Sequence, residues 1–306
     1  MDFTASPEFQ IVLQLLSPDY MWSASERYGK GDAIKGSRLA YVETRKLIRL
    51  LVNNAREREK EEQQLDRLPK DLELAMLIRN LGWPIFANIP KLIPITNDWR
   101  KMANTFWPNG TPINGGFRVS VGDTKFSDVY EATIMATSRL LKQHNDSNRA
   151  VLDGRVWKRS DSLVMVHFEL RNGLMSMVMD PAKRDQQWVH RKLRKGLKTA
   201  VKFSRTKMAP YSAKLLMEWA KAGFIGSPAG AMISGCPGAE EGYGALVPCN
   251  GIPMVICVNE PTDGKVFIGV TLDHRALDGN AAKGIYMFLQ NEIKEILNED
   301  INHRRS

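Results

Sequence analysis

Apolar residues follow two different spacings along the chain, and each spacing indicates its own kind of secondary structure. From residue 117 onward, short runs rich in Val and Ile alternate with longer segments in which apolar positions recur every three or four residues. The first pattern is typical of buried strands and the second of amphipathic helices. We therefore predict strands at 117–121, 162–170, 174–179, 230–234, 253–258 and 266–272, and helices at 126–144, 186–203, 211–222 and 281–297.

The N-terminal part of the chain has helical spacing and no strand pattern. The tripeptide Ser6–Glu8 provides a capping hydroxyl, a proline and an acid in that order, which predicts the start of a helix. Helical spacing returns within residues 37–65 and 71–81. We predict that residues 1–82 form a helical N-terminal extension, packed on a mixed α/β domain at 83–306 rather than forming an independent module.

The composition is typical of a folded protein. The 306 residues are 43% hydrophobic and 25% charged. No apolar run reaches the roughly 18 residues that a membrane-spanning helix needs, so no membrane association is expected. The first residues lack the basic charge of a secretory signal. The cysteines are odd in number and lack metal-ligand spacing, so we expect a cytoplasmic protein with no disulfide and no metal site; they are Cys236, Cys249 and Cys257.

The positive charge is concentrated in one segment. Between Lys183 and Lys207 there are ten Lys and Arg residues and one Asp, which gives this segment a net charge of +9, equal to that of the whole chain. Such a field indicates an anionic partner, although an ordinary solvated helix face remains the alternative. The basic residues that we expect to attract a substrate or carrier lie on the predicted helix; they are Arg191, Lys192, Arg194, Lys195 and Lys198.

The sharpest local motif is Thr271–Gly279, which reads Thr-Leu-Asp-His-Arg-Ala-Leu-Asp-Gly between a predicted strand and a predicted helix. A histidine on a tight turn at a strand end, here His274, is well placed to act as a base. We expect Asp278 to hold the loop by pairing with an arginine. Arg275 belongs to the same loop, and Gly279 is expected to permit the tight entry into the helix. By itself this pattern is weak, and a locally hydrogen-bonded loop histidine is the alternative.

A second candidate lies 40 residues earlier in the chain. Ser234 ends a predicted strand that runs into a glycine-containing loop, where its hydroxyl can donate a hydrogen bond to an oxyanion. Other candidates are expected to be structural: His167 lies in an alternating strand, Trp188 faces the core, and Cys236 is a small buried residue.

The order of these motifs resembles the catalytic domain of the dihydrolipoyl acyltransferases of 2-oxo acid dehydrogenase complexes, which share the chloramphenicol acetyltransferase fold. An Ile-Ser step before a glycine loop, a segment with Asn250 and Pro253, and Asp-His-Arg-x-x-Asp-Gly carry the resemblance. It covers about residues 105–298. It implies a mixed sheet flanked by helices and an acyltransferase with His274 as general base and Ser234 as oxyanion donor.

The resemblance also implies substrates and an assembly. The donor would be a thioester of coenzyme A, of an acyl-carrier protein or of lipoyl, and the acceptor a thiol or hydroxyl, with no covalently bound cofactor. Because residues 83–306 hold a single unit of this fold, the channel is expected between subunits of a homotrimer or a multiple of one. There His274 of one chain would face Ser234 of its neighbour. The sequence departs from the family in having no lipoyl or subunit-binding domain, so a lipoyl or carrier domain would come from another chain. Pro237 is expected to reshape the loop after Ser234.

Two other functions were weighed against acyl transfer, and one of them stays open. A non-catalytic trimeric scaffold or assembly protein with the same fold is the main alternative, although the presence of both His274 and Ser234 argues against it. Nucleic-acid binding through the basic helix is not expected, because no recognised nucleic-acid motif accompanies the charge.

Overall fold

The computed structural model of this protein describes residues 7–17, 20, 23–24, 27, 42–51, 92–94, 112–144, 147–152, 155–170, 173–205, 229–244 and 251–305. The chain forms two compact units, Met1–Ile89 with Val201–Gly226 and Pro90–Ala200 with Ser227–Ser306. The boundary expected between residues 82 and 83 lies outside the described residues, as do the helices predicted at 71–81 and 211–222. The division into 1–82 and 83–306 therefore stays a prediction.

In the first unit, helix α1 (Pro7–Leu15) begins at the proline that the sequence pattern places in its first turn. Its Phe9 and Val12 side chains are fully buried, with the i, i+3 spacing of an amphipathic helix. Residues 42–51 are also helical, and Ile48 is buried there. These helices agree with the helical pattern predicted for the N-terminal part of the chain.

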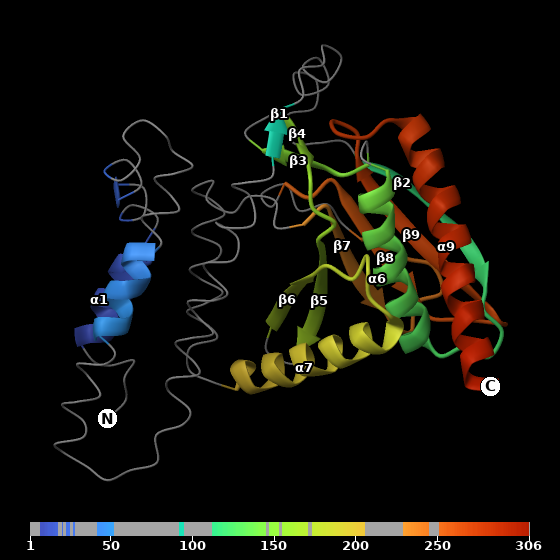
Figure 1. The fold of residues 1–306 in the computed structure, drawn as a ribbon, viewed down its shortest axis with the longest axis horizontal. Helices are drawn as coiled ribbons and strands as arrows, with labels where there is room; N and C mark the ends of the chain where they lie inside the picture. Colours follow the sequence, from blue (N-terminus) through green and yellow to red (C-terminus); the bar gives the residue numbers. More distant parts are fainter. Residues whose placement is uncertain are drawn as a thin grey trace, which may run out of the picture. The chain divides into compact units, whose positions relative to one another are not determined.

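The second unit is built on a six-stranded mixed sheet (Figure 1). In sheet order its strands are β2 (Pro112–Ser120), β9 (Lys265–Asp273), β8 (Met254–Asn259), β7 (Ala231–Cys236), β5 (Val164–Leu170) and β6 (Gly173–Met179). Strand β7 runs parallel to both of its neighbours, and the other pairs are antiparallel. The mixed α/β class predicted from the sequence is confirmed.

The structure contains three short strands that the sequence pattern did not predict. They form a second sheet in the order β1 (Leu92–Pro94), β4 (Arg155–Arg159) and β3 (Arg149–Leu152). Each strand is at most five residues long; β4 has three basic residues and β1 ends in proline. Hydrophobic periodicity gives little signal over so few residues, so the pairing of these strands depends on the surrounding fold.

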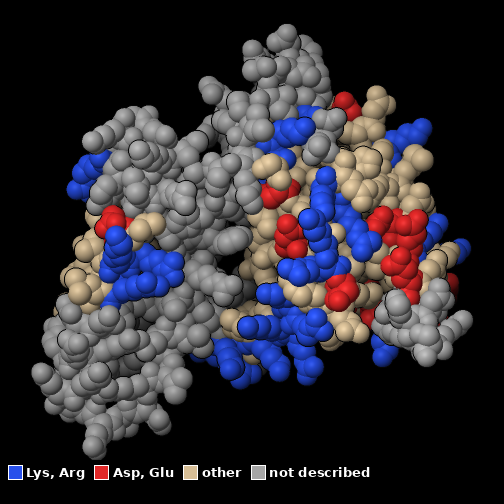
Figure 2. Space-filling model, in the orientation of Figure 1, with Lys and Arg blue, Asp and Glu red and all other residues tan. Residues whose placement is uncertain are grey.

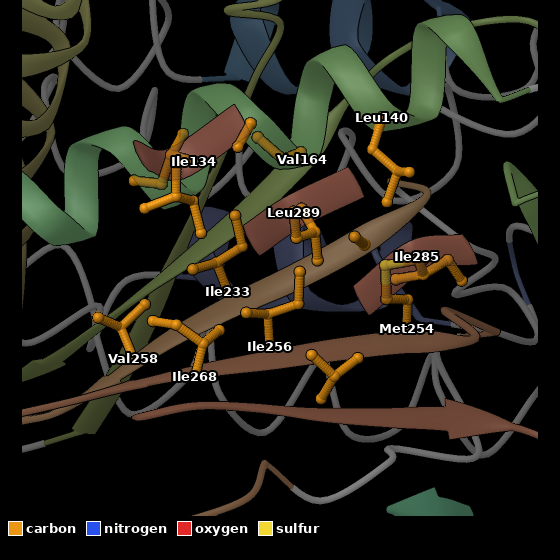
Figure 3. Close-up of a cluster of buried hydrophobic side chains, with 14 of the residues drawn as sticks. Ile134, Leu140, Val164, Ile233, Met254, Ile256, Val258, Ile268, Ile285 and Leu289 are labelled. Carbon is orange, nitrogen blue, oxygen red and sulfur yellow. The ribbon is translucent and has the colours of Figure 1, made fainter. Parts of the chain in front are cut away.

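Helices α6 (Phe126–Gln143) and α9 (Gly279–Arg305) cover one face of the large sheet (Figure 1). Ile134 from α6 and Leu289 from α9 lie against Ile233, Ile256 and Ile268 from the strands (Figure 3), and all five are fully buried. Burying each such side chain contributes about 1.5–3 kcal/mol. None of the helices in the described part of the chain is long and apolar enough to span a bilayer.

Both faces of the central strands are covered, which explains their continuous apolar runs. Along β7, Ile233 faces the helices, while Met232 belongs to a second buried cluster that includes Val255. Since successive side chains alternate in a strand, Ser234 shares the face of Met232, opposite the helices.

The long helix α7 (Gln186–Ser204) begins beside α6, where Gln186 Nε2 donates to the Asp128 carbonyl at 3.4 Å.

The expectation that no disulfide forms is wrong. Cys236 and Cys257 are joined by a disulfide between the neighbouring strands β7 and β8. The pairing register explains it: Cys257 lies opposite Ser234, and Cys236 projects from the same face as Ser234, two residues further along the strand. The Cα atoms are 6.4 Å apart, within the range that a disulfide spans. Sequence spacing gives no sign of this pairing, because the two residues meet only through the sheet.

Candidate active site

The turn after β9 presents His274 between two residues that are held firmly in place. The Asp273 carboxylate accepts a hydrogen bond from the Arg275 backbone N–H at 3.0 Å, which forms an Asx turn with His274 at its centre. Arg275 Nη2 also donates to Asp273 Oδ2 at 2.6 Å, in an ion pair whose side chains are 8% and 6% exposed. His274 itself is half-buried. The backbone and the ion pair therefore fix its position while leaving part of the side chain accessible.

Asp278 holds the end of the same loop by capping α9. Its Oδ1 accepts a hydrogen bond from the Ala281 backbone N–H at 2.8 Å, the geometry of an N-cap residue. The arginine of this loop, Arg275, forms its ion pair with Asp273. Asp278 therefore holds the loop by capping the helix, and not by the arginine pair that the sequence led us to expect.

Gly279 does not serve the purpose expected of it. Gly279 is the first residue of α9, and its φ is not positive. A Cβ added there would meet no atom within 4 Å. The tight entry into the helix therefore does not require glycine.

Ser234 is half-buried near the C-terminal end of β7, and a defined turn follows it. Pro237 and Gly238 occupy the central positions, Gly238 has φ +82°, and the Ala239 N–H donates to the Cys236 carbonyl at 3.2 Å. This is a type II turn, in which proline and glycine are the favoured central residues. The Pro237 that departs from the family pattern thus has a specific place in the backbone.

The backbone beside Ser234 rests on two aromatic rings of α6, a support that the sequence analysis missed. Phe126 and Tyr130 stack with ring centroids 5.8 Å apart. A Cβ on Gly235 would lie 3.0 Å from Phe126 Cζ, a tight contact, so glycine lets the strand approach the ring without displacing it. The Tyr130 hydroxyl donates to the Ile233 carbonyl at 3.4 Å, and burial raises the pKa of Tyr130. The only sequence signal was an aromatic pair at i, i+4 in a predicted helix.

Within one chain, Ser234 lies level with the middle of strand β9, whereas His274 lies just beyond the end of that strand. Ser234 is opposite Cys257, which is opposite Gly269, and His274 follows Gly269 by five residues. At about 3.3 Å per residue and 4.8 Å per strand, their Cα atoms are about 19 Å apart. No extended conformation of the two side chains closes that distance, so one chain does not bring them to the same reacting atom.

Two other histidines of the second unit, His167 and His190, have structural contacts. His167 Nδ1 lies 2.9 Å from Ser176 Oγ across β5 and β6, its Nε2 touches Met232 Sδ, and burial lowers its pKa. His190 on α7 pairs with Glu131 of α6 at 2.8 Å. Burial raises the pKa of Glu131, and His190 partly offsets that rise.

The basic residues singled out on α7 are all exposed, and Figure 2 shows Lys and Arg side chains gathered at this edge of the molecule. Lys192 lies over the ring of Trp188, 5.3 Å from its centroid, and Trp188 packs partly against the core as expected. In the described part of the chain, no three His, Cys, Asp or Glu side chains gather into a group able to hold a metal ion.

No family model and no curated protein matches this chain. Solved structures with a similar arrangement include a probable dihydrolipoamide acetyltransferase from Listeria monocytogenes (13% identity, 67% of this chain and 94% of that chain, TM-score 0.47). A dihydrolipoamide acetyltransferase from Azotobacter vinelandii has 16% identity over 65% of this chain and 88% of its own, with a TM-score of 0.46. A chloramphenicol acetyltransferase has 13% identity over 66% of this chain and 99% of its own, with a TM-score of 0.46. These are the classes of protein that the sequence motifs resemble, and at such identities and TM-scores we draw no functional inference from them.

Proposed function

We propose that this chain is an acyltransferase that moves an acyl group from a thioester donor to a thiol or hydroxyl acceptor. The observation that carries the proposal is the turn after β9, where an Asx turn and a buried ion pair hold a half-exposed His274. The resemblance of the surrounding sequence to dihydrolipoyl acyltransferases supports the same chemistry. The donor would be a thioester of coenzyme A, of an acyl-carrier protein or of lipoyl.

The chemistry assigns one task to each residue. Neutral His274 takes the proton of the acceptor as the acceptor attacks the thioester carbonyl. Ser234 donates a hydrogen bond to the oxyanion of the tetrahedral intermediate. The intermediate then expels the donor thiolate, which recovers the proton from His274. Asp278 positions the loop through the cap of α9 and takes no proton.

The separation of Ser234 from His274 supports a site built from two copies of the chain. A hydrogen-bond donor and a base that act on one carbonyl must each lie about 3 Å from the reacting atoms. The register separates the two residues by about 19 Å in one chain. We therefore propose a homotrimer, or a multiple of one, in which His274 of one chain faces Ser234 of its neighbour.

The test of the proposed function is His274→Ala, assayed by product mass with several acyl-CoA donors and with dihydrolipoamide or an alcohol as acceptor. Loss of the base is expected to lower kcat by roughly 10²–10⁴-fold. His144→Gln, which changes a histidine outside the proposed catalytic residues, is the matched control. Wild-type turnover in the alanine variant would remove His274 as the base. Absence of transfer by the wild-type protein with every donor would favour the non-catalytic scaffold instead.

A further inference from the structure

His167 lies next to Ser234 in the sheet, although the mechanism above gives it no task. Val166 of β5 lies opposite Ile233 of β7, and the next residues along these two parallel strands are His167 and Ser234 (Figure 1). Val166 and Ile233 belong to the cluster that faces the helices, so His167 and Ser234 both project from the other face. Neighbouring strands are about 4.8 Å apart, which makes the two residues direct neighbours.

The two residues belong to a polar row that crosses three strands. Ser176 of β6 lies opposite His167, so Ser176, His167 and Ser234 stand side by side on one face. The preceding row on the same face is wholly apolar; its residues are Val178, Met165, Met232 and Val255. Since a polar group near such a cluster is costly unless it is hydrogen-bonded, the arrangement favours hydrogen bonds within the polar row.

The two ring nitrogens of His167 face the two neighbouring strands. Nδ1 lies 2.9 Å from Ser176 Oγ on β6. Nε2 touches Met232 Sδ on β7, two residues before Ser234 on the same face. A thioether sulfur is a weak acceptor, so a proton on Nε2 gains little from Met232. The hydroxyl of Ser234 is the stronger acceptor beside it.

A single direction of hydrogen bonding suits the proposed chemistry. Burial lowers the pKa of His167, so the ring is neutral at pH 7 and only one nitrogen carries a proton. If the Ser176 hydroxyl donates to Nδ1, that proton is on Nε2 and points toward β7. Ser234 Oγ can then accept it and keep its own hydroxyl proton for an oxyanion. Hydrogen bonds that follow one another in this way polarise and strengthen each other.

We propose that His167 is a positioning residue for Ser234 of the same chain: Nε2–H donates to Ser234 Oγ and directs the Ser234 hydroxyl toward the oxyanion. Ser176 completes the arrangement by donating to Nδ1. The inference rests on the proposed function, in which Ser234 is the oxyanion donor. His167 takes no proton from the substrate, and His274 of the neighbouring chain remains the base.

The first test needs no catalysis. Nitrogen NMR signals of the histidine rings are recorded at pH 7 in the full-length protein with isotope-labelled histidine, and His167→Gln identifies the His167 signals among those of the five histidines. We expect the proton on Nε2. Ser234→Ala should shift the Nε2 signal, and Ser176→Ala should raise the share of rings protonated on Nδ1. Val178→Ala, in the apolar row, is the matched control and should leave the protonated nitrogen unchanged.

The second test asks whether His167 acts through Ser234. His167→Leu is expected to lower kcat for acyl transfer roughly three- to tenfold with KM nearly unchanged, because the lost hydrogen bond matters in the transition state. His167→Gln keeps an N–H in a similar place and should recover most of this loss. In a Ser234→Ala background His167→Leu should cost nothing further, whereas Val178→Ala should change kcat by the same factor in both backgrounds.

Three results would overturn the proposal. They are a neutral His167 ring protonated on Nδ1, an Nε2 signal that Ser234→Ala does not change, and a loss from His167→Leu that is the same with and without the Ser234 hydroxyl. Absence of acyl transfer by the wild-type protein would refute the proposed function instead. The ring signals would still decide in that case whether His167 donates to Ser234.

Discussion

The ion pair beside His274 allows a quantitative test of how the turn is held. Asp273 and Arg275 lie two residues apart, with side chains only 6% and 8% exposed, and Arg275 donates to both carboxylate oxygens. The Asp273 backbone N–H also donates to the Pro253 carbonyl at 2.8 Å, which ties the turn to the start of β8. Asp273→Asn keeps the size of the side chain and removes the charge that faces the buried guanidinium.

The expected cost follows from burial. Removing one partner of a buried ion pair typically costs about 3–5 kcal/mol, because the other charge stays desolvated without its counter-charge. Asp273→Asn and Arg275→Met are each expected to fall in that range. The double variant Asp273→Asn/Arg275→Met removes both charges and keeps the side-chain oxygen that accepts the Arg275 backbone N–H, so its free energy of unfolding is expected to fall by less than in either single variant. The two substitutions are therefore expected to be strongly non-additive.

Urea unfolding of the four proteins at pH 7, followed by far-ultraviolet circular dichroism, measures these free energies. Equal m-values across the set would show that the comparison concerns the folded state. If each single variant lost less than about 1 kcal/mol, or if the double variant lost the sum of the two single losses, the pair would not be the anchor of the turn.

Two further predictions concern the other face of the sheet. The Cys236–Cys257 disulfide closes a loop with a sequence separation of 21, so its reduction is expected to lower the free energy of unfolding by about 3 kcal/mol. A thiol titration of the unreduced, denatured protein should find one reactive thiol among the three cysteines, and three reactive thiols would refute the disulfide. Burial lowers the pKa of His167 below its ordinary value of 6.5, so the imidazole binds a proton more readily in the unfolded chain than in the folded protein. The free energy of unfolding should therefore fall as the pH drops below about 6.5. His167→Gln should flatten this dependence between pH 7 and pH 5, and an unchanged slope would contradict the assignment.

The long elements of the second unit were predictable because each carries a strong period. Strand β8 reads as a continuous apolar run because both of its faces are buried, and α6 shows a clear helical repeat. The short strands β3 and β4 were missed because periodicity over four or five residues is weak, and three of the five residues of β4 are basic.

The sequence indicated the residue types of the candidate site but not its contacts. His274 and Ser234 stood out because each ends a strand pattern beside a glycine-containing loop. The helix cap made by Asp278, the rings beneath Gly235 and the disulfide arise between residues that only folding brings together. The separation of the two candidate residues likewise depends on strand register, which no local pattern specifies.

The central claim, that His274 of one chain acts with Ser234 of another, is tested most directly by mixing two inactive variants. His274→Ala and Ser234→Ala are purified separately, unfolded, and refolded together in equal amounts, and acyl transfer is compared with that of wild type treated alike. In a cyclic trimer with random mixing, about a quarter of the sites would combine an intact His274 with an intact Ser234, so about a quarter of wild-type activity is expected. If the mixture is no more active than the two variants refolded separately, the two residues do not meet between chains and the proposed site is wrong.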